Sequence, residues 1–190
     1  MKELIHTSIR ESIAVKQAIL GDERFQNKIA EAAGFMISAF RGGGKVLFCG
    51  NGGSAADAQH LAAELSGRFY KDRPPLYAEA LHVNTSFVTA VANDYGYDEV
   101  FARMVEASGR AGDVLVAIST SGNSPNILKC IERAQKQGMV VVGFTGVSGG
   151  KMAAVCELLL NVPSGDTPRI QEAHIMIGHI ICDLVEREMF

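Results

Sequence analysis

The first forty or so residues place apolar and polar side chains with the period of an α-helix. Apolar residues recur every three to four positions from Leu4 to Leu20 and again from Ile29 to Phe40. This spacing predicts two helices, the second over about 22–40. Three glycines, Gly42 to Gly44, follow at once, and a glycine run ends a helix. The chain is therefore predicted to begin with a helical pair over residues 1–41.

Beyond these glycines, the apolar residues form short unbroken runs bounded by turn residues. Such runs are typical of strands that are buried on both faces. They occupy 45–49, 113–118, 139–144 and 158–162, with a weaker run at 77–83. Helix-length segments separate them, at about 54–66, 86–92, 98–108, 125–137 and from 168 onward. This alternation predicts an α/β fold, with a doubly wound, mainly parallel five-stranded sheet.

We expect a single domain over residues 1–190, with the α/β core at 45–190. Hydrophobic residues make up 47% of the chain and charged residues 21%, which is enough for a packed core. The net charge is −3 and the basic residues form no run, which argues against a nucleic-acid or membrane surface. We find no secretory h-region and no apolar run of spanning length. A soluble cytoplasmic protein with four reduced cysteines is expected.

The loop after the first predicted strand, Gly50 to Ser54, is rich in glycine. Glycines let backbone N–H groups approach an anion closely. The pattern Gly50-x-Gly52-x-x-Ala55 matches a variant dinucleotide fingerprint, but the next strand ends near His82 to Asn84, without the acidic residue that binds ribose. No Gly-Lys-Ser/Thr follows either. A nicotinamide site is disfavoured, and a plain tight turn is the simpler alternative.

The loop after the 113–118 strand carries the strongest local signal. It reads Ser119-Thr120-Ser121-Gly122-Asn123-Ser124-Pro125. Three consecutive hydroxyl residues and a glycine precede a serine N-cap with proline at the first helical position. Hydroxyl and free backbone N–H groups at a helix N-terminus bind phosphate without a lysine. The loop predicts a site for a phosphorylated small molecule, with an elaborate helix cap as the alternative.

Two predicted helices carry side chains suited to chemistry. His60 and Glu64 lie four residues apart on one helical face, a geometry for a metal, for a base with its partner, or for a solvated surface pair. His179 lies in an apolar stretch, where a lone histidine is more often a core residue. Gln171 precedes it by about 12 Å along the helix, at the limit of one metal's reach. These residues alone leave metal binding undecided.

Three segments together resemble the sugar isomerase (SIS) domain family: Gly50 to Ser54, Ile118 to Ser124, and Arg169-Ile170-Gln171-Glu172-x-His174. The likeness covers nearly the whole chain and includes Ala92 to Gly96 and Gly149 to Ala153. The resemblance implies a flavodoxin-like SIS fold. It also implies an aldose–ketose isomerase that converts sedoheptulose 7-phosphate to D-glycero-D-manno-heptose 7-phosphate, the first step of nucleotide-activated heptose biosynthesis, for lipopolysaccharide or another glycan.

The resemblance also implies roles for single residues. Glu64 and His179 match the catalytic pair, and zinc is implied on His60, Glu64, Gln171 and His179. Contacts to the sugar are implied for Asn51, Gly52, Gly53, Asn93 and Asp94, contacts to the phosphate for Ser119, Thr120, Ser121 and Ser124, and further substrate contacts for Glu64, Arg68 and Gln171. No nucleotide cofactor is expected. The family implies a homotetramer that uses helices 1–41, with active sites at subunit interfaces.

The implied chemistry assigns a proton transfer to each member of the pair. Glu64 would take the C1 proton of the ketose and return it at C2 through a cis-enediol, while His179 would move a proton between the oxygens. A zinc ion, when bound, would polarise the carbonyl. The alternative is a non-catalytic SIS protein that binds a replication initiator or acts as a sugar-phosphate sensor, and one related branch of the family binds a replication initiator and is not an isomerase. That branch lacks the acid and the histidine that this chain keeps at Glu64 and His179, which favours the enzyme.

Overall fold

The computed structural model describes residues 1–190 and contains one five-stranded sheet. Its strands are β1 (Val46–Gly50), β2 (Ala78–Ala80), β3 (Val114–Ile118), β4 (Val140–Thr145) and β5 (Leu158–Asn161). All pairings are parallel, in the order β2-β1-β3-β4-β5. This is the flavodoxin-like order, and it confirms the predicted fold class. The order reverses at β1 and β3, so the loops after these two strands meet at the usual ligand crevice.

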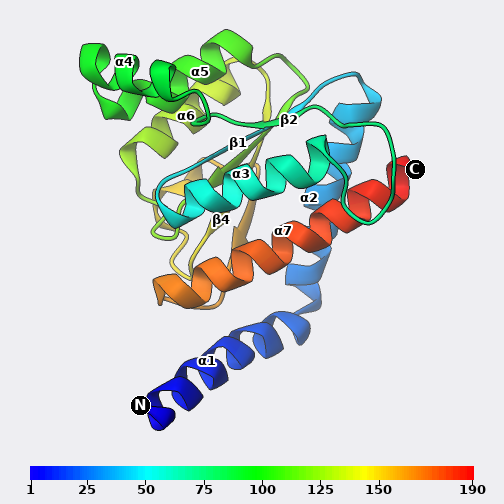
Figure 1. The fold of residues 1–190 in the computed structure, drawn as a ribbon, viewed down its shortest axis with the longest axis vertical. Coiled ribbons are helices and arrows are strands. Elements are labelled where there is room, and N and C mark those ends of the chain that lie inside the picture. The colour runs from blue at the N-terminus through cyan, green and yellow to red at the C-terminus, as the bar shows by residue number, and fades with distance from the viewer.

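The helices follow the predicted sequence of elements (Figure 1). The N-terminal pair is α1 (Lys2–Leu20) and α2 (Glu23–Arg41). The others are α3 (Gly53–Ser66), α4 (Thr85–Tyr95), α5 (Val100–Ser108), α6 (Pro125–Lys136) and α7 (Thr167–Met189), with short 3-10 turns η1 (Tyr97–Glu99) and η2 (Gly150–Ala154). Asp22 caps α2 by accepting a hydrogen bond from the backbone N–H of Phe25 (3.1 Å), which separates the first two helices.

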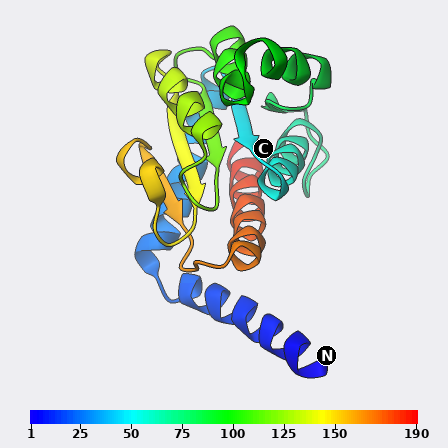
Figure 2. The same ribbon diagram turned by 90° about the vertical axis from the view of Figure 1, so that its left-hand side faces the viewer.

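The sheet separates two apolar cores because alternate residues of each strand point to opposite faces. Val46 and Phe48 of β1 belong to the core shared with α2, α3 and α7. Leu47 and Cys49 belong to the core shared with α4, α5 and α6. Figure 2 shows these two helical layers on either side of the strands. All four cysteines are free thiols, as predicted.

Three predicted boundaries need correction. The strand predicted over 77–83 is limited to Ala78–Ala80, because the chain turns at Leu81 and Asn84 caps α4 by accepting from the N–H of Phe87. Helix α4 continues to Tyr95, beyond the predicted end at 92. The helix predicted from 98 begins as the η1 turn and becomes α-helical at Val100. Gly96, at φ +91°, makes the break between α4 and η1.

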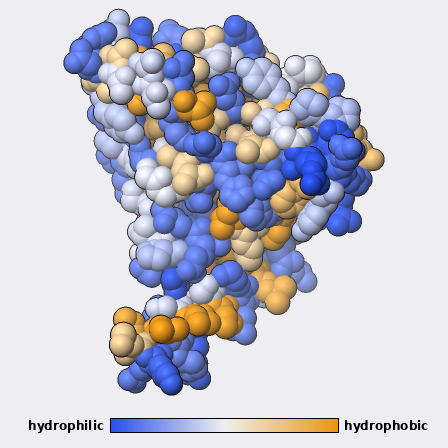
Figure 3. All heavy atoms as spheres, in the orientation of Figure 1, coloured by the Kyte–Doolittle hydropathy of each residue, from blue (hydrophilic) through white to orange (hydrophobic).

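Helix α1 projects away from the body of the molecule (Figures 1 and 2). Its apolar side chains Leu4, Ile5, Ile9 and Ile13 are 72%, 59%, 54% and 48% exposed. Figure 3 shows them as a hydrophobic row along the helix. Because these side chains are exposed, the row on α1 lacks an apolar partner within its own chain. No helix combines the length and the hydropathy that a membrane crossing needs.

Candidate active site

The glycine loop between β1 and α3 places free backbone donors at the crevice. A side chain at Gly50 would lie 2.4 Å from the carbonyl oxygen of Ser54, and Gly52 has φ +55°, so both positions require glycine. The N–H groups of Asn51 and Gly52 donate to no backbone acceptor. Since they precede the N-terminus of α3, they can meet an anionic or hydroxyl-rich ligand.

A pair of amides joins this loop to the first turn of α6, directly after residues 119–124, which we call the phosphate loop after their predicted role. The Asn51 amide donates to Asn126 Oδ1 (2.9 Å), and the Asn126 amide donates back to Asn51 Oδ1 (2.8 Å). The hydroxyl of Tyr97 also donates to Asn51 Oδ1 (3.2 Å). Asn126 is 2% exposed and fixes the orientation of Asn51 from the first turn of α6. Neither Asn126 nor Tyr97 was identified from the sequence, because no local pattern links them to residue 51.

The phosphate loop has the predicted form with one difference. Ser124 is the N-cap of α6 and Pro125 follows at the first position, but the Ser124 hydroxyl makes no capping bond. It instead lies 3.0 Å from the Ser119 hydroxyl. The backbone N–H groups of Thr120, Ser121 and Ser124 donate to no backbone acceptor. Several hydroxyl and N–H groups are thus free to bind a phosphate at the start of a helix.

The segment from Gly149 to Ala153 packs directly against the phosphate loop, because its first two residues are glycines. A side chain at Gly150 would lie 2.4 Å from the carbonyl oxygen of Ser121, and one at Gly122 would lie 2.2 Å from that of Gly149. The N–H of Met152 donates to the carbonyl of Gly122 (3.1 Å). These close backbone contacts fix the conformation of the phosphate loop.

His60, Glu64 and His179 come together on the outer side of the α3–α7 layer. His60 Nε2 lies 2.9 Å from Glu64 Oε1 and 3.3 Å from His179 Nε2. One potential ligand atom from each residue lies within 4.8 Å of the others. The side chains of His60 and Glu64 are 49% and 23% exposed. The cluster is therefore polar, convergent and open to a ligand.

Close helix packing explains why His179 meets His60. Gly178 lies against Leu61, and a side chain at Gly178 would come within 2.5 Å of the Leu61 methyl groups. A glycine at a helix crossing lets the two backbones approach. Because His179 and His60 are the chain neighbours of this contact, the crossing of α3 and α7 brings their imidazoles together.

The cluster fits a zinc ion in both chemistry and spacing. Two imidazole nitrogens and one carboxylate oxygen are ligands that catalytic zinc accepts, and tetrahedral zinc ligands lie about 3.3 Å apart. His60 Nε2 carries one hydrogen or one lone pair, so it cannot make ordinary hydrogen bonds to both Glu64 and His179 at once. A shared cation would satisfy all three groups, although the residues alone do not select zinc.

Gln171 lies apart from this cluster within one chain. Its side-chain amide packs against Gly53, 2.5 Å from where a side chain at that glycine would begin. Gly53 precedes His60 by about 10 Å along α3, and Glu64 by about 16 Å.

The remaining predicted substrate contacts are Arg68, Asn93 and Asp94. All three are exposed, and the Asn93 amide donates to the Asp94 carboxylate (2.8 Å).

Two titratable residues near the site were not identified as functional from the sequence. Asp57 lies one turn before His60, with one buried carboxylate oxygen that lacks a hydrogen-bond partner. Burial raises its pKa, while the charge of His60 opposes that shift. His174 is fully buried and its Nε2 contacts the Thr145 carbonyl oxygen (3.2 Å). Burial lowers the pKa of His174 to about 4 against that bond. His174 is therefore the core histidine of α7, whereas His179 is only half-buried.

Comparisons with known proteins show the family to which the chain belongs. The family model described as the SIS domain matches residues 11–146. The chain is 63% identical to a phosphoheptose isomerase of Rhodospirillum rubrum over 158 residues, covering 83% of this chain and 84% of the relative. It is 52% identical to that of Aneurinibacillus thermoaerophilus, covering 100% and 96%. A solved phosphoheptose isomerase from Neisseria gonorrhoeae superposes with a TM-score of 0.90 at 46% identity, covering 97% and 98%.

Proposed function

The chain belongs to the phosphoheptose isomerases of the SIS domain family, and we propose how its residues convert sedoheptulose 7-phosphate to D-glycero-D-manno-heptose 7-phosphate. The observation that carries the proposal is the convergence of His60, Glu64 and His179 within 4.8 Å. A carboxylate beside two imidazoles supplies both a base for carbon and a shuttle for oxygen-bound protons. A sugar-phosphate binding protein without turnover would need neither.

Glu64 and His179 carry the two proton transfers. Glu64 removes a proton from C1 of the ketose as the C2 carbonyl oxygen gains one, which gives a cis-enediol. Glu64 then returns its proton to C2, and the O1 hydroxyl loses its proton as C1 becomes the aldehyde carbon. His179 carries the proton between the two oxygens, so the isomerisation needs no external oxidant.

The binding groups hold the substrate at both ends. Ser119, Thr120, Ser121 and Ser124 bind the phosphate, and Asn51, Gly52 and Gly53 bind sugar hydroxyls with Asn93, Asp94 and Arg68. The phosphate lies far from the reacting carbons, so its binding energy serves to orient the sugar. His60, Glu64 and His179 would hold one zinc ion, with Gln171 as a further ligand. When bound, zinc would polarise the carbonyl and stabilise the developing negative charge.

A homotetramer with shared active sites accounts for two further features. Within one chain, about 16 Å of helix α3 separates the glycine loop from Glu64, a long reach for one seven-carbon sugar. Gln171 is likewise remote from the zinc ligands of its own chain. Groups from two copies would close both gaps, and the exposed apolar row of α1 (Leu4, Ile5, Ile9 and Ile13) offers the contact surface. Light scattering of an Ile9→Glu, Ile13→Glu double variant tests this: a smaller particle is expected.

Turnover of sedoheptulose 7-phosphate tests the function. The wild type should form an aldoheptose 7-phosphate and, in D2O, incorporate deuterium at C2. Glu64→Gln should lower kcat by about 10²–10⁴-fold because it removes the base. Glu188→Gln is the matched control, since that carboxylate is exposed at the end of α7 and pairs only with Arg41. Near-normal turnover by Glu64→Gln would reject the base assignment.

Two other results would redirect the proposal. A wild type that binds the substrate without turnover, and captures a replication initiator, would be a non-catalytic SIS protein. Full activity after exhaustive chelation, with no metal by elemental analysis, would remove zinc from the mechanism while leaving the isomerase in place.

A further inference from the structure

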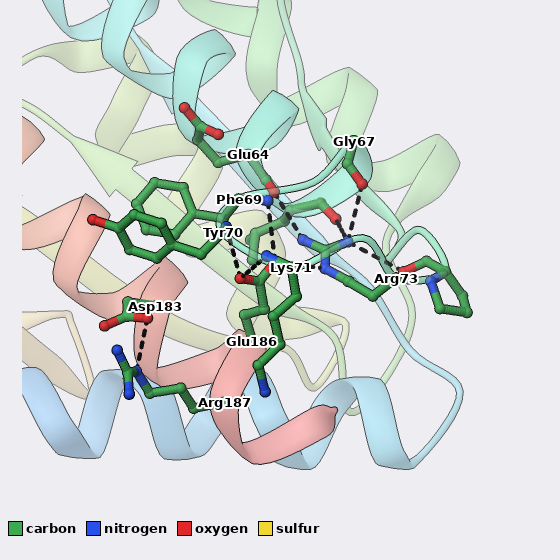
Figure 4. A network of polar contacts seen from close by, with 11 residues as sticks. Glu64, Gly67, Phe69, Tyr70, Lys71, Arg73, Asp183, Glu186 and Arg187 are labelled. Atoms are coloured by element: carbon green, nitrogen blue, oxygen red, sulfur yellow. Dashed lines mark hydrogen bonds and ion pairs between the residues drawn. The ribbon is translucent and has the colours of Figure 1, made fainter.

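A buried carboxylate on α7 holds the irregular segment that follows α3 (Figure 4). Glu186 accepts hydrogen bonds from three consecutive backbone N–H groups, those of Phe69 (3.1 Å), Tyr70 (2.8 Å) and Lys71 (2.8 Å). It also accepts one from Arg73 Nε (3.0 Å). The segment forms no helix or strand of its own, so these bonds fix its path across the end of α7.

Arg73 carries the connection on to the last turn of α3. Its guanidinium donates to the carbonyl oxygens of Glu64 (2.9 Å), Leu65 (2.7 Å) and Gly67 (3.1 Å). The last carbonyls of a helix have no partner within it, so a cation placed there satisfies them and interacts favourably with the helix dipole. One of the three carbonyls belongs to Glu64, the proposed base.

The Arg73–Glu186 ion pair is almost completely enclosed. The two side chains are 2% and 1% exposed. Burial disfavours the charged form of Glu186, but the N–H groups of Lys71, Phe69 and Tyr70 and the Arg73 guanidinium outweigh it and hold its pKa below the ordinary value. A buried ion pair adds little net stability compared with apolar residues of similar shape. What such a pair supplies best is a defined geometry.

We infer that Arg73 and Glu186 are positioning residues, which set the Glu64 carboxylate against His179. Glu186 follows His179 by seven residues, close to two helical turns, and so lies on the same face of α7. Arg73 binds the backbone of Glu64 itself. A single ion pair thus fixes the last turn of α3 relative to the stretch of α7 that carries the proton shuttle. Neither residue touches the reacting atoms. This inference rests on the proposed isomerase function.

A second buried pair provides a matched control. Asp113 accepts from Lys45 Nζ (2.6 Å) and from the backbone N–H groups of Lys45 (3.0 Å) and Arg110 (2.8 Å). Its side chain is 2% exposed. These bonds join the starts of β1 and β3, and Asp113 makes no hydrogen bond to α3 or α7. Like Glu186→Gln, Asp113→Asn replaces a buried, ion-paired carboxylate by an amide, but it leaves the contacts of α3 and α7 unchanged.

The experiment compares Glu186→Gln and Arg73→Lys with Asp113→Asn in the full-length protein. Arg73→Lys keeps the charge but loses the forked donors, and it serves if Glu186→Gln folds poorly. Each kcat is corrected for the folded fraction, measured by circular dichroism. We expect both positioning variants to lose about 10- to 100-fold in kcat, because small misplacements of reacting groups are costly, with KM within about twofold of the wild type. Asp113→Asn should keep the wild-type kcat.

Titration with Co²⁺ alone gives a readout independent of turnover. Cobalt absorbs in the visible range when bound by imidazole and carboxylate ligands, so its affinity reports the geometry of His60, Glu64 and His179. Both positioning variants should bind Co²⁺ more weakly than Asp113→Asn. If the wild type shows no turnover, the proposed function is rejected. The Co²⁺ affinities of the positioning variants and of Asp113→Asn then decide alone whether Arg73 and Glu186 position the cluster. The inference is overturned if neither kcat nor Co²⁺ affinity differs from that of Asp113→Asn.

Discussion

The Arg73–Glu186 and Lys45–Asp113 pairs are built alike but hold different parts of the molecule. Each places a carboxylate that is at most 2% exposed between a cation and backbone N–H groups. The first joins the end of α3 to α7, the two helices that carry Glu64 and His179, whereas the second joins the starts of two strands. On the proposed mechanism, the first ion pair holds the elements that carry the reacting groups, whereas the second holds only the scaffold.

Truncation of either carboxylate should produce the largest loss of stability. Glu186→Ala and Asp113→Ala should each lower the free energy of unfolding by about 3–5 kcal/mol, because each leaves an unpaired buried cation and unsatisfied N–H groups. Urea unfolding measures both losses. Exposed ion pairs contribute at most about 1 kcal/mol. A loss below that value for Glu186→Ala would show that the Arg73–Glu186 pair does not behave as a buried pair.

The pH dependence of stability should show when Glu186 stops contributing. Its pKa is held below the ordinary value of 4.5, since its hydrogen bonds outweigh the effect of burial. The stabilisation is therefore complete above pH 4.5 and is lost as the pH falls through the lower folded-state pKa. The difference in unfolding free energy between wild type and Glu186→Gln should be constant near neutral pH and shrink below pH 4.5. A difference that grows on acidification would contradict this.

His174, on the same helix, should act in a higher pH window. Its pKa falls from 6.5 to about 4 on folding, through burial. Between these values the unfolded chain binds a proton that the folded protein does not, so acidification from pH 6.5 to 4 should cost about 3 kcal/mol. His174→Gln keeps a donor toward the Thr145 carbonyl and should flatten this slope. An unchanged slope would assign the acid sensitivity to other groups.

Two glycine positions extend the comparison of site and scaffold. Gly122 and Gly112 both have positive φ, +66° and +87°. A side chain at Gly112 meets nothing within 4 Å, whereas one at Gly122 would clash with the Gly149 backbone. Gly112→Ala should cost about 1 kcal/mol from backbone strain alone. Gly122→Ala should cost more and also raise KM, because it distorts the phosphate loop. Equal KM values for the two variants would show that the shape of the phosphate loop does not affect substrate binding.

The smallest effect is expected at an exposed ion pair on α7, next to the buried Glu186. Arg187 pairs with Asp183 at 2.8 Å, but its side chain is 68% exposed (Figure 4). Arg187→Gln should change the free energy of unfolding by no more than about 0.5 kcal/mol, since surface pairs contribute little. Its kcat should match the wild type. A large kcat loss here would show that α7 is sensitive to any change, and would weaken the case for the buried pair.

The strands and the phosphate loop could be predicted from the sequence because they are local features. Each buried strand is a short apolar run, and Ser119 to Ser124 is recognised from neighbouring residues alone. The pairing of His60 with Glu64 is also local, since four residues separate neighbours on one helical face. The segment at 77–83 was harder to delimit, because an edge strand of three residues has too few positions to show a pattern.

Only the tertiary structure decided which distant residues meet. The sequence offered two histidines on α7, and the contact of Gly178 with Leu61 selects His179 for the cluster while burial makes His174 a core residue. Nothing near Arg73 or Glu186 in the sequence marks them as partners 113 residues apart. The physical reason is that backbone periodicity fixes neighbours within an element, whereas the packing of α3 on α7 fixes neighbours between elements.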